Sequence, residues 1–330
     1  MFSVGIDIAS EKHEVALYSQ ECGIIERFSI KNSQEGFQKL ITKTNSLSPK
    51  RFSLESSGPY GKALERFLIR NNYDVRVFPP LKVYRFKNLQ KEYLKTDSFD
   101  AEVIAKLGAS EFAENEPKAE MSRYGQHKMI LHHLFRMKRE LASLKNKIHA
   151  LTAQQDGDSF LLGLLTDQMK FLKNKIAQTE KLVYPQIMGE AESQKEIGFL
   201  TSIPGIGLKT AITFLVEIEN IKKFPSVERL VGFVGWYPKI SQSGKYLNPS
   251  PKMVKKGSRY LRKMLFMASL AAVRHNLAMR NLFNKKISQG KKKKQALINV
   301  GGKLLRIMWG VLKNQTLYSE NRIFIQPLTT

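Results

Sequence analysis

Two long helical patterns occupy the middle of the chain, at residues 124–155 and 160–184. In the first pattern, apolar residues recur at spacings of three and four, at Leu131, Leu134, Met137, Leu141, Leu144 and Ile148. Such spacing places them on one helical face, which is typical of a coiled coil. Residues 156–158 (DGD) predict a turn between two antiparallel helices. A helical hairpin inside the chain divides it into two ends, and 330 residues suffice for a domain at each.

The part before the hairpin alternates apolar runs with amphipathic segments. Strands are predicted at 3–9, 13–18, 24–30, 51–56 and 74–78, and helices at 34–46, 61–72 and, capped by Thr96, 97–112. This order, three strands and then helix, strand, helix, strand, helix, is that of a ribonuclease H-like domain, although composition alone says only α/β. The sequence therefore predicts an α/β domain over residues 1–116, the hairpin over 117–196 and a mainly helical domain over 197–330.

Charge is distributed unevenly along the chain. From Arg229 to Ser319 there is no Asp or Glu, whereas the same stretch carries 20 Lys and Arg; residues 1–116 carry 17 basic and 16 acidic residues. The net charge of +25 predicts an extended polyanionic partner, most often nucleic acid, with an anionic membrane surface as the competing interpretation. The chain thus has a part suited to divalent metals and a part suited to phosphates.

Other bulk features exclude several classes of protein. No run of about 18 apolar residues occurs, so no membrane-spanning helix is expected. The N-terminus lacks the basic and apolar regions of a secretion signal. The single Cys22 excludes a disulfide framework and a zinc site of the cysteine type. A reducing cytoplasm fits these features.

Four carboxylates stand out in the N-terminal part. Asp7 lies in an apolar first strand, where a charge is costly unless it binds something. Glu55 ends the fourth strand, and Asp97 and Asp100 are three residues apart on one helical face. The first and fourth strands of a ribonuclease H-like sheet are neighbours, so these acids are expected to converge on Mg²⁺ or Mn²⁺ that clamps a phosphodiester. Taken singly, Asp97 could simply cap its helix and Glu55 could pair with a lysine.

The acid-free stretch contains a candidate nucleophile, Ser243, beside Gly244. Cations for a scissile phosphate lie near it in sequence, at Lys245, Lys255, Lys256, Arg259 and Arg262. The segment contains no carboxylate, and no histidine precedes His275, so activation of the hydroxyl would have to come from elsewhere. From spacing alone, a plain polar turn is the favoured alternative.

Smaller signals follow the hairpin. Gly205, Gly207 and Lys209 lie in IPGIGLKTA, which predicts a helix-hairpin-helix-like element: a tight turn precedes a helix whose N–H groups suit a DNA phosphate. An ordinary glycine turn is as good an interpretation. The hairpin histidines, His127, His132, His133 and His149, are expected at the surface or in the core more than at a metal. Trp236 and Tyr237 are expected in the core rather than stacked on a base.

Several ordered motifs resemble the DEDD transposases of a bacterial insertion-sequence family related to the Piv DNA invertase. The first half carries GIDIAS with Asp7, LESSGPYG with Glu55, and KTDSFDAEVIA with Asp97 and Asp100; the second carries IPGIGLKTAITFLVEI, FPSVERLVGFVGWYP, QSGK and KKGSRYLRKML. The resemblance covers nearly the whole chain. Many relatives have paired serines before the glycine, whereas here Gln242 separates Ser241 from Ser243. We therefore assign the nucleophile to Ser243, with Ser241 as the fallback.

The resemblance implies more than the residues alone. It implies a RuvC-like N-terminal domain and a site-specific recombinase that cuts and rejoins donor and target DNA through a phosphoserine–DNA link. It also implies a noncoding bridge RNA as guide, and a homo-oligomer, dimer or tetramer, assembled through the hairpin. The expected location is the bacterial cytoplasm, at the nucleoid. Two alternatives stay open: a Holliday-junction endonuclease that uses water as its nucleophile, and a nucleic-acid-binding protein without catalysis.

Overall fold

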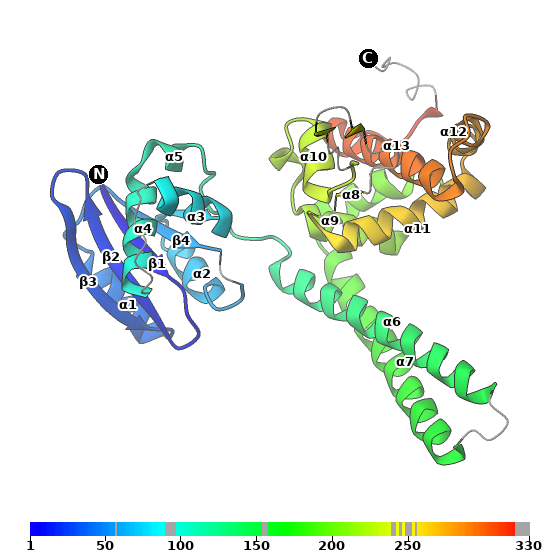
Figure 1. The fold of residues 1–330 in the computed structure, drawn as a ribbon, viewed down its shortest axis with the longest axis horizontal. Helices are drawn as coiled ribbons and strands as arrows, with labels where there is room; N and C mark the ends of the chain where they lie inside the picture. The colour runs from blue at the N-terminus through cyan, green and yellow to red at the C-terminus, as the bar shows by residue number, and fades with distance from the viewer. Residues whose placement is uncertain are drawn as a thin grey trace. The chain divides into compact units, whose positions relative to one another are not determined.

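The chain folds into two compact units, Met1–Ser122 and Arg123–Thr330 (Figure 1). The computed structural model describes residues 1–56, 58–89, 97–153, 158–238, 242–243, 246–247, 253–254 and 256–320, with the backbone alone for 97, 98, 242, 243, 246 and 247. Each unit has its own hydrophobic core. Among the described residues, no helix combines the length and the apolar character that a membrane span requires.

The first unit is built on a five-stranded sheet of order β3-β2-β1-β4-β5. The strands are β1 Phe2–Asp7, β2 Lys12–Ser19, β3 Gly23–Lys31, β4 Lys50–Glu55 and β5 Asp74–Phe78. The first three strands pair antiparallel, and β4 and β5 run parallel to β1. This order and these directions are those of the ribonuclease H-like sheet, so the α/β prediction for this unit is confirmed at the level of topology.

Five helices accompany this sheet. They are α1 Gln34–Lys43, α2 Lys62–Arg70, α3 Pro80–Leu89, α4 Asp97–Ala109 and α5 Glu111–Glu114. Helix α3 was not expected, because Pro79-Pro80 reads as a strand stop; Pro80 is instead the first helical residue, a position where the missing N–H costs nothing. The single helix predicted over 97–112 is two, since α4 ends at Ala109. The predicted cap Thr96 lies outside the described residues.

Alternation along β1 sorts its side chains between two faces of the sheet. Val4 and Ile6 are buried in the cluster that includes residues of α1 and α2. Gly5 lies on the opposite face, under α4, where an added Cβ would come within 2.2 Å of the Ala101 carbonyl oxygen and 2.3 Å of the Ala105 nitrogen. Only glycine allows this approach, so α4 contacts the strand nearly backbone to backbone. Asp7 shares the face of Gly5, because side chains alternate along a strand.

The second unit begins with the hairpin, in which α6 and α7 lie side by side (Figure 1). Its elements are α6 Gly125–Thr152, α7 Ser159–Met188, α8 Ala191–Thr201, α9 Leu208–Ile218, η1 Ile221–Lys223, α10 Val227–Val234, β6 Gln242–Ser243, β7 Tyr246–Leu247, α11 Arg259–His275, α12 Leu277–Ser288 and α13 Lys293–Asn314. Leu131, Leu134, Met137 and Leu144 are buried in the hairpin, as their spacing predicts, while Leu141 is only partly buried.

A helical body follows the hairpin, with α11 packed against α9, α12 and α13. The sequence predicts helices over 254–276 and 295–313, with the Lys291–Lys294 run in a loop between them. Helix α11 begins later than residue 254, because Gly257 has φ +91 and Ser258 supplies the N-cap by accepting from the Leu261 N–H at 3.2 Å. Lys293 and Lys294 are not in a loop but form the start of α13. Trp236 is a core residue as expected: it is buried, and its Nε1–H donates to the Ile298 carbonyl at 2.9 Å.

Candidate functional site: a carboxylate edge and a basic helical face

Asp7 and Glu55 lie at the same edge of the sheet. They are the last residues of β1 and β4, which are parallel neighbours with Ile6 opposite Leu54. Ser53 faces α4, since a Cβ on Gly108 would meet its Oγ at 1.8 Å. Glu55, two residues further on, therefore lies on the α4 face as well, as Asp7 does. Both carboxylates are half-buried.

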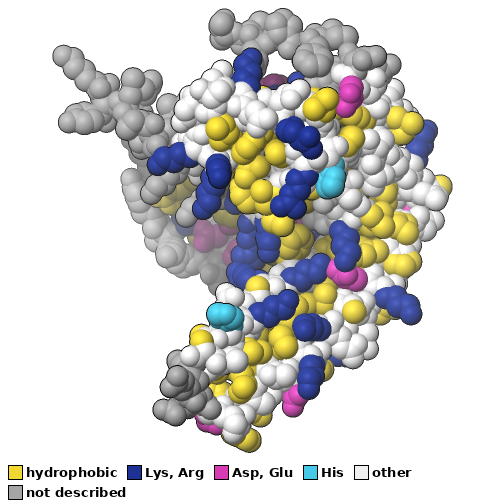
Figure 2. Space-filling view, turned by 90° about the vertical axis from the view of Figure 1, so that its right-hand side faces the viewer, with side chains coloured by type: hydrophobic (Ala, Val, Ile, Leu, Met, Phe, Trp, Pro, Cys, Tyr) yellow, Lys and Arg dark blue, Asp and Glu magenta, His cyan; other side chains and the backbone are white. Residues whose placement is uncertain are grey.

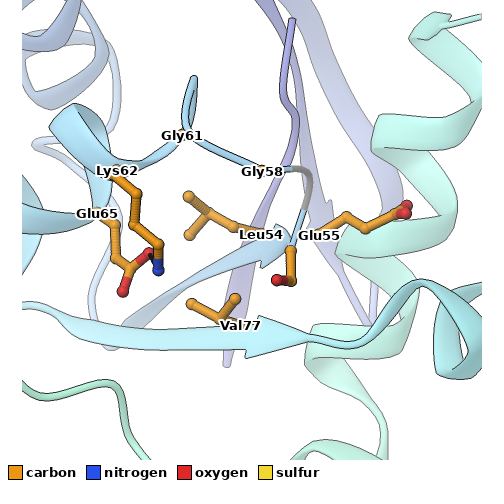
Figure 3. A pocket seen from close by; sticks show the side chains of 8 residues that line it. Leu54, Glu55, Gly58, Gly61, Lys62, Glu65 and Val77 are labelled. Atoms are coloured by element: carbon orange, nitrogen blue, oxygen red, sulfur yellow. Dashed lines mark hydrogen bonds and ion pairs between the residues drawn. The ribbon is translucent and has the colours of Figure 1, made fainter. Parts of the chain in front are cut away.

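Asp100 completes the part of this edge whose side chains the structure describes. Burial raises the pKa of the Glu55 carboxyl, and the negative charge of Asp100 raises it further. In Figure 3, Glu55 points toward α4, the helix that carries Asp100, and away from Lys62 and Glu65. Asp100 in turn accepts from Lys87 Nζ at 2.5 Å. Two carboxylates that repel each other are thus held together, with one lysine beside them.

These residues fit a hard divalent cation. Carboxylate oxygens are the ligands that Mg²⁺ prefers, and a pair whose charges repel has the electrostatics that a cation relieves. Asp97 is the first residue of α4, three positions before Asp100, but its side chain lies outside the described part of the chain. Among the side chains that the structure describes, no cluster of three His, Cys, Asp or Glu forms a complete metal site.

Glu14 is a further carboxylate at this edge that the sequence did not single out. It lies directly opposite Asp7 in the antiparallel β1–β2 pair, so the two side chains share the α4 face. Glu14 also pairs with Lys12 at 2.8 Å. Strand register could have found it, because the short turn between β1 and β2 fixes which residues face each other.

The hollow on the other side of Glu55 is too small for a substrate. It measures about 10 Å³ and is lined by Leu54, Glu55, Gly61 and their neighbours (Figure 3). This is room for about one water molecule. On its rim Lys62 Nζ donates to Glu65 at 2.6 Å. This hollow therefore does not hold the substrate of the carboxylates.

The predicted nucleophile lies in a short hairpin of the second unit. Ser243 belongs to β6 and is opposite Tyr246 of β7, but its side chain is outside the described part. The predicted phosphate ligands Lys245 and Lys255 and the fallback Ser241 also fall outside the described residues. The structure therefore gives a backbone position for Ser243 and nothing about its hydroxyl.

The other predicted phosphate ligands have different surroundings. Lys256 and Arg259 are exposed, and Arg259 is the first residue of α11. Arg262 donates from Nη1 to the carbonyls of Val234 and Lys256, both at 3.0 Å. It therefore ties the end of α10 to the segment before α11, a structural role that sequence spacing did not predict.

The IPGIGLKTA segment also has a packing explanation. Gly205 has φ +99, and a Cβ there would lie 2.5 Å from the Ala272 Cα of α11, so only glycine fits. Gly207 is the N-cap residue of α9. Lys209 donates to Glu180 of α7 at 2.6 Å. The turn between α8 and α9 is present, and its contact with nucleic acid stays a prediction.

A buried polar link joins the hairpin to the body, and the sequence did not reveal it. Glu217 of α9 accepts from Ser258 Oγ at 2.8 Å and contacts Nε2 of His132 on α6. Burial alone would raise the pKa of the Glu217 carboxyl, but the hydrogen bonds from His132 and Ser258 outweigh it and lower the pKa. His132 also stacks on Tyr260 with ring centroids 3.8 Å apart.

Comparisons with known proteins match the chain in two parts, one before α7 and one after it. A transposase family model of the DEDD type matches residues 4–154, and a model described as "Transposase IS116/IS110/IS902 family" matches residues 198–284. The pilin gene-inverting protein of Moraxella bovis is 26% identical over 317 residues, covering 94% of this chain and 95% of that protein. An uncharacterized 43.6 kDa protein of the insertion element IS110 from Streptomyces coelicolor is 24% identical over 145 residues, 44% of this chain and 36% of that protein.

Part of the chain is similar to solved structures. Among them is T. thermophilus RuvC in complex with Holliday junction substrate, with a TM-score of 0.30 and 11% identity, covering 36% of this chain and 100% of that one. A score this low supports no inference about function. The first family model matches the chain before α7, and the second matches it after α7. The chain therefore belongs to the IS110 family of transposases, enzymes with a DEDD nuclease-like domain.

Proposed function

We propose that this transposase is an RNA-guided, site-specific DNA recombinase that uses a Mg²⁺-binding DEDD site and a serine nucleophile. The observation that carries the proposal is the position of Asp7 and Glu55 at the ends of the neighbouring strands β1 and β4, with Asp100 of α4 close enough to Glu55 to raise its pKa. The relative named as a pilin gene-inverting protein supports cutting and rejoining of DNA, because inversion requires both steps. The bacterial nucleoid, in the cytoplasm, is the expected place of action.

Each step of the proposed chemistry exchanges one phosphoester bond for another. The Ser243 hydroxyl attacks a DNA phosphorus; the serine O–P bond forms while the P–O3′ bond breaks, so that the 3′ end leaves as a hydroxyl and the 5′ phosphate stays on the protein. The serine proton passes to a base. Attack by a second 3′ hydroxyl on the phosphoserine then rejoins the strands and returns the serine. Neither step requires water or an external energy source.

The four carboxylates would hold the metal. Asp7, Glu55, Asp97 and Asp100 would bind Mg²⁺ or Mn²⁺, which supplies charge stabilisation at the phosphodiester. Lys87, held on Asp100, places a positive charge at the same edge.

The basic helical part would hold the nucleic acids. Donor and target duplex DNA and a noncoding guide RNA are all polyanions, and the acid-free stretch Arg229–Ser319 carries 20 Lys and Arg. We place Lys256 and Arg259 among the contacts, because both are exposed. Lys245, Lys255 and Arg262, together with the glycine turn at Gly205, Gly207 and Lys209, complete the proposed set.

The hairpin is proposed to bring copies of the chain together. Helix α7 exposes a series of large apolar side chains: Phe160 is 74% exposed, Leu164 53%, Phe171 61% and Leu182 67%. Such a stripe on a long helix is typical of a helix that packs against another. The carboxylates of one protomer would then serve the serine of another, with residues 1–116, 117–196 and 197–330 as catalytic, assembly and serine domains.

Trapping of the covalent intermediate tests the proposal. Incubation of the protein with its guide RNA and labelled donor and target DNA, followed by denaturing electrophoresis, is expected to show a DNA adduct that survives SDS. Ser243→Ala should abolish the adduct while RNA binding survives, and Ser241→Ala should leave it. An adduct from Ser243→Ala would refute the serine assignment. Free 5′ phosphates without an adduct would identify water as the nucleophile and favour a junction nuclease.

The guide RNA has its own test. RNA that co-purifies with the protein from cells carrying the element is sequenced. A defined species transcribed from the DNA flanking the open reading frame is expected if the protein is RNA-guided. A random sample of cellular RNA would contradict guidance and reflect charge attraction alone.

A further inference from the structure

A cleft separates α6 of the hairpin from α11 of the helical body. It measures about 210 Å³ and is lined by Phe135, Arg136, Arg139, Arg259, Tyr260 and Lys263. Three of these residues belong to each helix, and both helices are in the same compact unit. Sites for drug-sized ligands usually have about 300–1,000 Å³, so this cleft suits a smaller group.

The rim of the cleft is positively charged. Arg136, Arg139, Arg259 and Lys263 are all exposed. Within the described part of the chain none of the four forms an ion pair; the contacts that the structure gives them are with His133, Tyr260 and the Phe135 ring. Figure 2 shows Lys and Arg side chains spread over the face of the molecule that it draws, with few Asp or Glu among them. Four uncompensated cations around one cleft attract an anion with more than one charge.

The floor of the cleft is aromatic. The rings of Phe135 and Tyr260 contact each other with centroids 5.2 Å apart, at an interplanar angle of 56°. Arg259 lies 5.0 Å from the centre of the Tyr260 ring, and Lys263 lies 5.9 Å from that of Phe135. A site for phosphate alone has no use for two rings, whereas a nucleobase stacks on such surfaces.

Tyr260 is held in a fixed position from behind. His132 stacks on it at 3.8 Å, and His132 is itself fixed by the buried Glu217. Glu217 also accepts from Ser258, the N-cap of α11, so the ring and the start of its helix have one anchor. A ring restrained in this way loses little freedom when a base stacks on it, which favours binding.

We propose that this cleft binds an unpaired nucleotide of a nucleic-acid strand. The base lies against Phe135 and Tyr260, and the flanking phosphates contact the four cations of the rim. A base inside a duplex is already stacked on its neighbours, so the aromatic floor selects a single-stranded or extruded nucleotide. The inference rests on the proposed nucleic-acid function but is independent of the cutting chemistry. The strand is RNA or DNA, and the experiment separates the two.

Binding is measured by fluorescence anisotropy of the full-length protein in EDTA, so that no cleavage occurs. The probes are one short sequence made as single-stranded DNA, as single-stranded RNA and as duplex DNA. Phe135→Leu keeps the apolar bulk but removes the ring, and is expected to weaken single-strand binding about tenfold and duplex binding less than about twofold. Arg136→Gln with Arg139→Gln should lower the slope of log affinity against log salt by about 0.7 for each lost phosphate contact.

The matched control for charge is Lys145→Gln with Lys173→Gln, which removes two exposed cations from elsewhere on the hairpin. It should change single-strand binding less than about twofold, because these two lysines contribute only non-specific attraction to the nucleic acid. Equal losses in the control and the rim variant, or equal losses for duplex and single strand in Phe135→Leu, would overturn the proposal. Loss confined to RNA identifies the strand as RNA, and loss confined to DNA identifies it as DNA.

Photocrosslinking of the wild-type protein locates the base without any variant. The single-stranded probe carries 5-iodouracil, which crosslinks to aromatic rings on which it stacks. Peptide mapping is expected to place the crosslink on Phe135 or Tyr260. Crosslinks that occur only in other peptides would refute the site. Because neither measurement depends on Ser243 or on a metal, the cleft can fail while the recombinase proposal stands, and the reverse.

Discussion

The pKa of Glu55 links the stability of the first unit to pH and to metal binding at the carboxylate edge. Its pKa is raised by burial and by Asp100, so the folded protein holds its proton more tightly than the unfolded chain does. The unfolding free energy therefore falls as pH rises from the ordinary carboxyl range through the raised pKa. At neutral pH the ionised carboxyl is a source of instability that a bound cation relieves. Protons and metal compete for it, so metal affinity should fall on acidification through the raised pKa.

Glu55→Gln is expected to raise the thermal midpoint of the metal-free protein at neutral pH and to remove the stabilisation that Mg²⁺ gives the wild type. The neutral amide carries no charge to be buried or repelled by Asp100. Thermal unfolding with and without Mg²⁺, at matched ionic strength, measures both effects. Glu65→Gln is the control, since Glu65 lines the same hollow but pairs with Lys62. Undiminished Mg²⁺ stabilisation of Glu55→Gln would count against a metal at this edge.

Glu217→Gln is expected to cost about 1–3 kcal/mol of unfolding free energy at pH 7, because it loses charge-assisted bonds from His132 and Ser258. The pKa of Glu217 is lowered in the folded state, so its contribution is complete above the ordinary carboxyl pKa and disappears as pH falls through the lowered one. Urea unfolding at neutral and acidic pH should show the difference from wild type shrinking in acid.

The control for this residue is Glu219→Gln. Glu219 is more accessible than Glu217 and pairs with Lys223 at 3.0 Å and with Lys128 at 3.9 Å. Ion pairs near the surface typically contribute about 1 kcal/mol or less. Equal losses for the two variants, or a Glu217→Gln loss that does not change with pH, would contradict the role given to the buried link.

The carboxylates of the first unit could be predicted from the sequence, whereas the buried link of Glu217 with His132 and Ser258 could not. Asp7 and Glu55 are singled out by their places in predicted strands, and Asp100 by its helical spacing from Asp97, and these patterns can be read over a few residues. The link between His132 and Glu217 spans 85 positions and that between Glu217 and Ser258 spans 41. Each of the three residues alone looks ordinary, and only the packing of α6, α9 and α11 brings them together. The Ser243 side chain is beyond the described residues, so its role stays a prediction.

At the scale of elements, the contact of α4 with β1 positions the acidic site. Gly5→Ala is expected to destabilise the first unit by about 1–3 kcal/mol, because its Cβ would meet backbone atoms of Ala101 and Ala105 that cannot move alone. It should also weaken the Mg²⁺ stabilisation, since Asp100 shifts with its helix. Urea unfolding and thermal shift measure the two.

Gly163→Ala is the matched substitution in α7, where no atom lies within 4 Å of an added Cβ. It should stabilise its own unit by about 0.5–1 kcal/mol, because alanine has the higher helix propensity. A neutral Gly5→Ala would show that α4 adjusts freely and does not fix the carboxylates.

The elements themselves were largely predictable from periodicity. All five strands of the first unit and the two hairpin helices appear where apolar spacing places them. The exceptions have local causes: proline at the start of α3 resembles a strand stop, and the left-handed Gly257 delays α11 to Arg259. Gly5 is conspicuous only after the partner helix is known, because a sequence does not reveal which backbone approaches a glycine.

At the scale of the whole molecule, the proposed division of labour between copies can be tested by mixing two inactive proteins. Asp7→Asn keeps the serine and Ser243→Ala keeps the carboxylates. Neither alone should form the covalent DNA adduct, and the mixture should recover a measurable fraction of wild-type adduct if one chain's carboxylates serve another chain's serine. A mixture that stays inactive would place both groups of one working site in a single chain.

Charge and motif order predict three parts, residues 1–116, 117–196 and 197–330, whereas the structure has two compact units, because the hairpin packs with the helical body in the unit Arg123–Thr330. The α6–α11 cleft could not be anticipated, because Phe135 and Tyr260 are 125 positions apart in the chain numbering and each resembles an ordinary half-buried aromatic residue. Its cations are likewise spread over two helices, so no basic run in the sequence marks them.

The cleft has one more consequence, because half of it belongs to the hairpin and half to the body. If the proposed nucleotide binds there, it contacts the hairpin and the body at once. If protomers also meet through the hairpin, as proposed, any effect of the bound strand on assembly is reciprocal: assembly must change nucleotide affinity by the same factor. Nucleic-acid loading and assembly would then be linked equilibria.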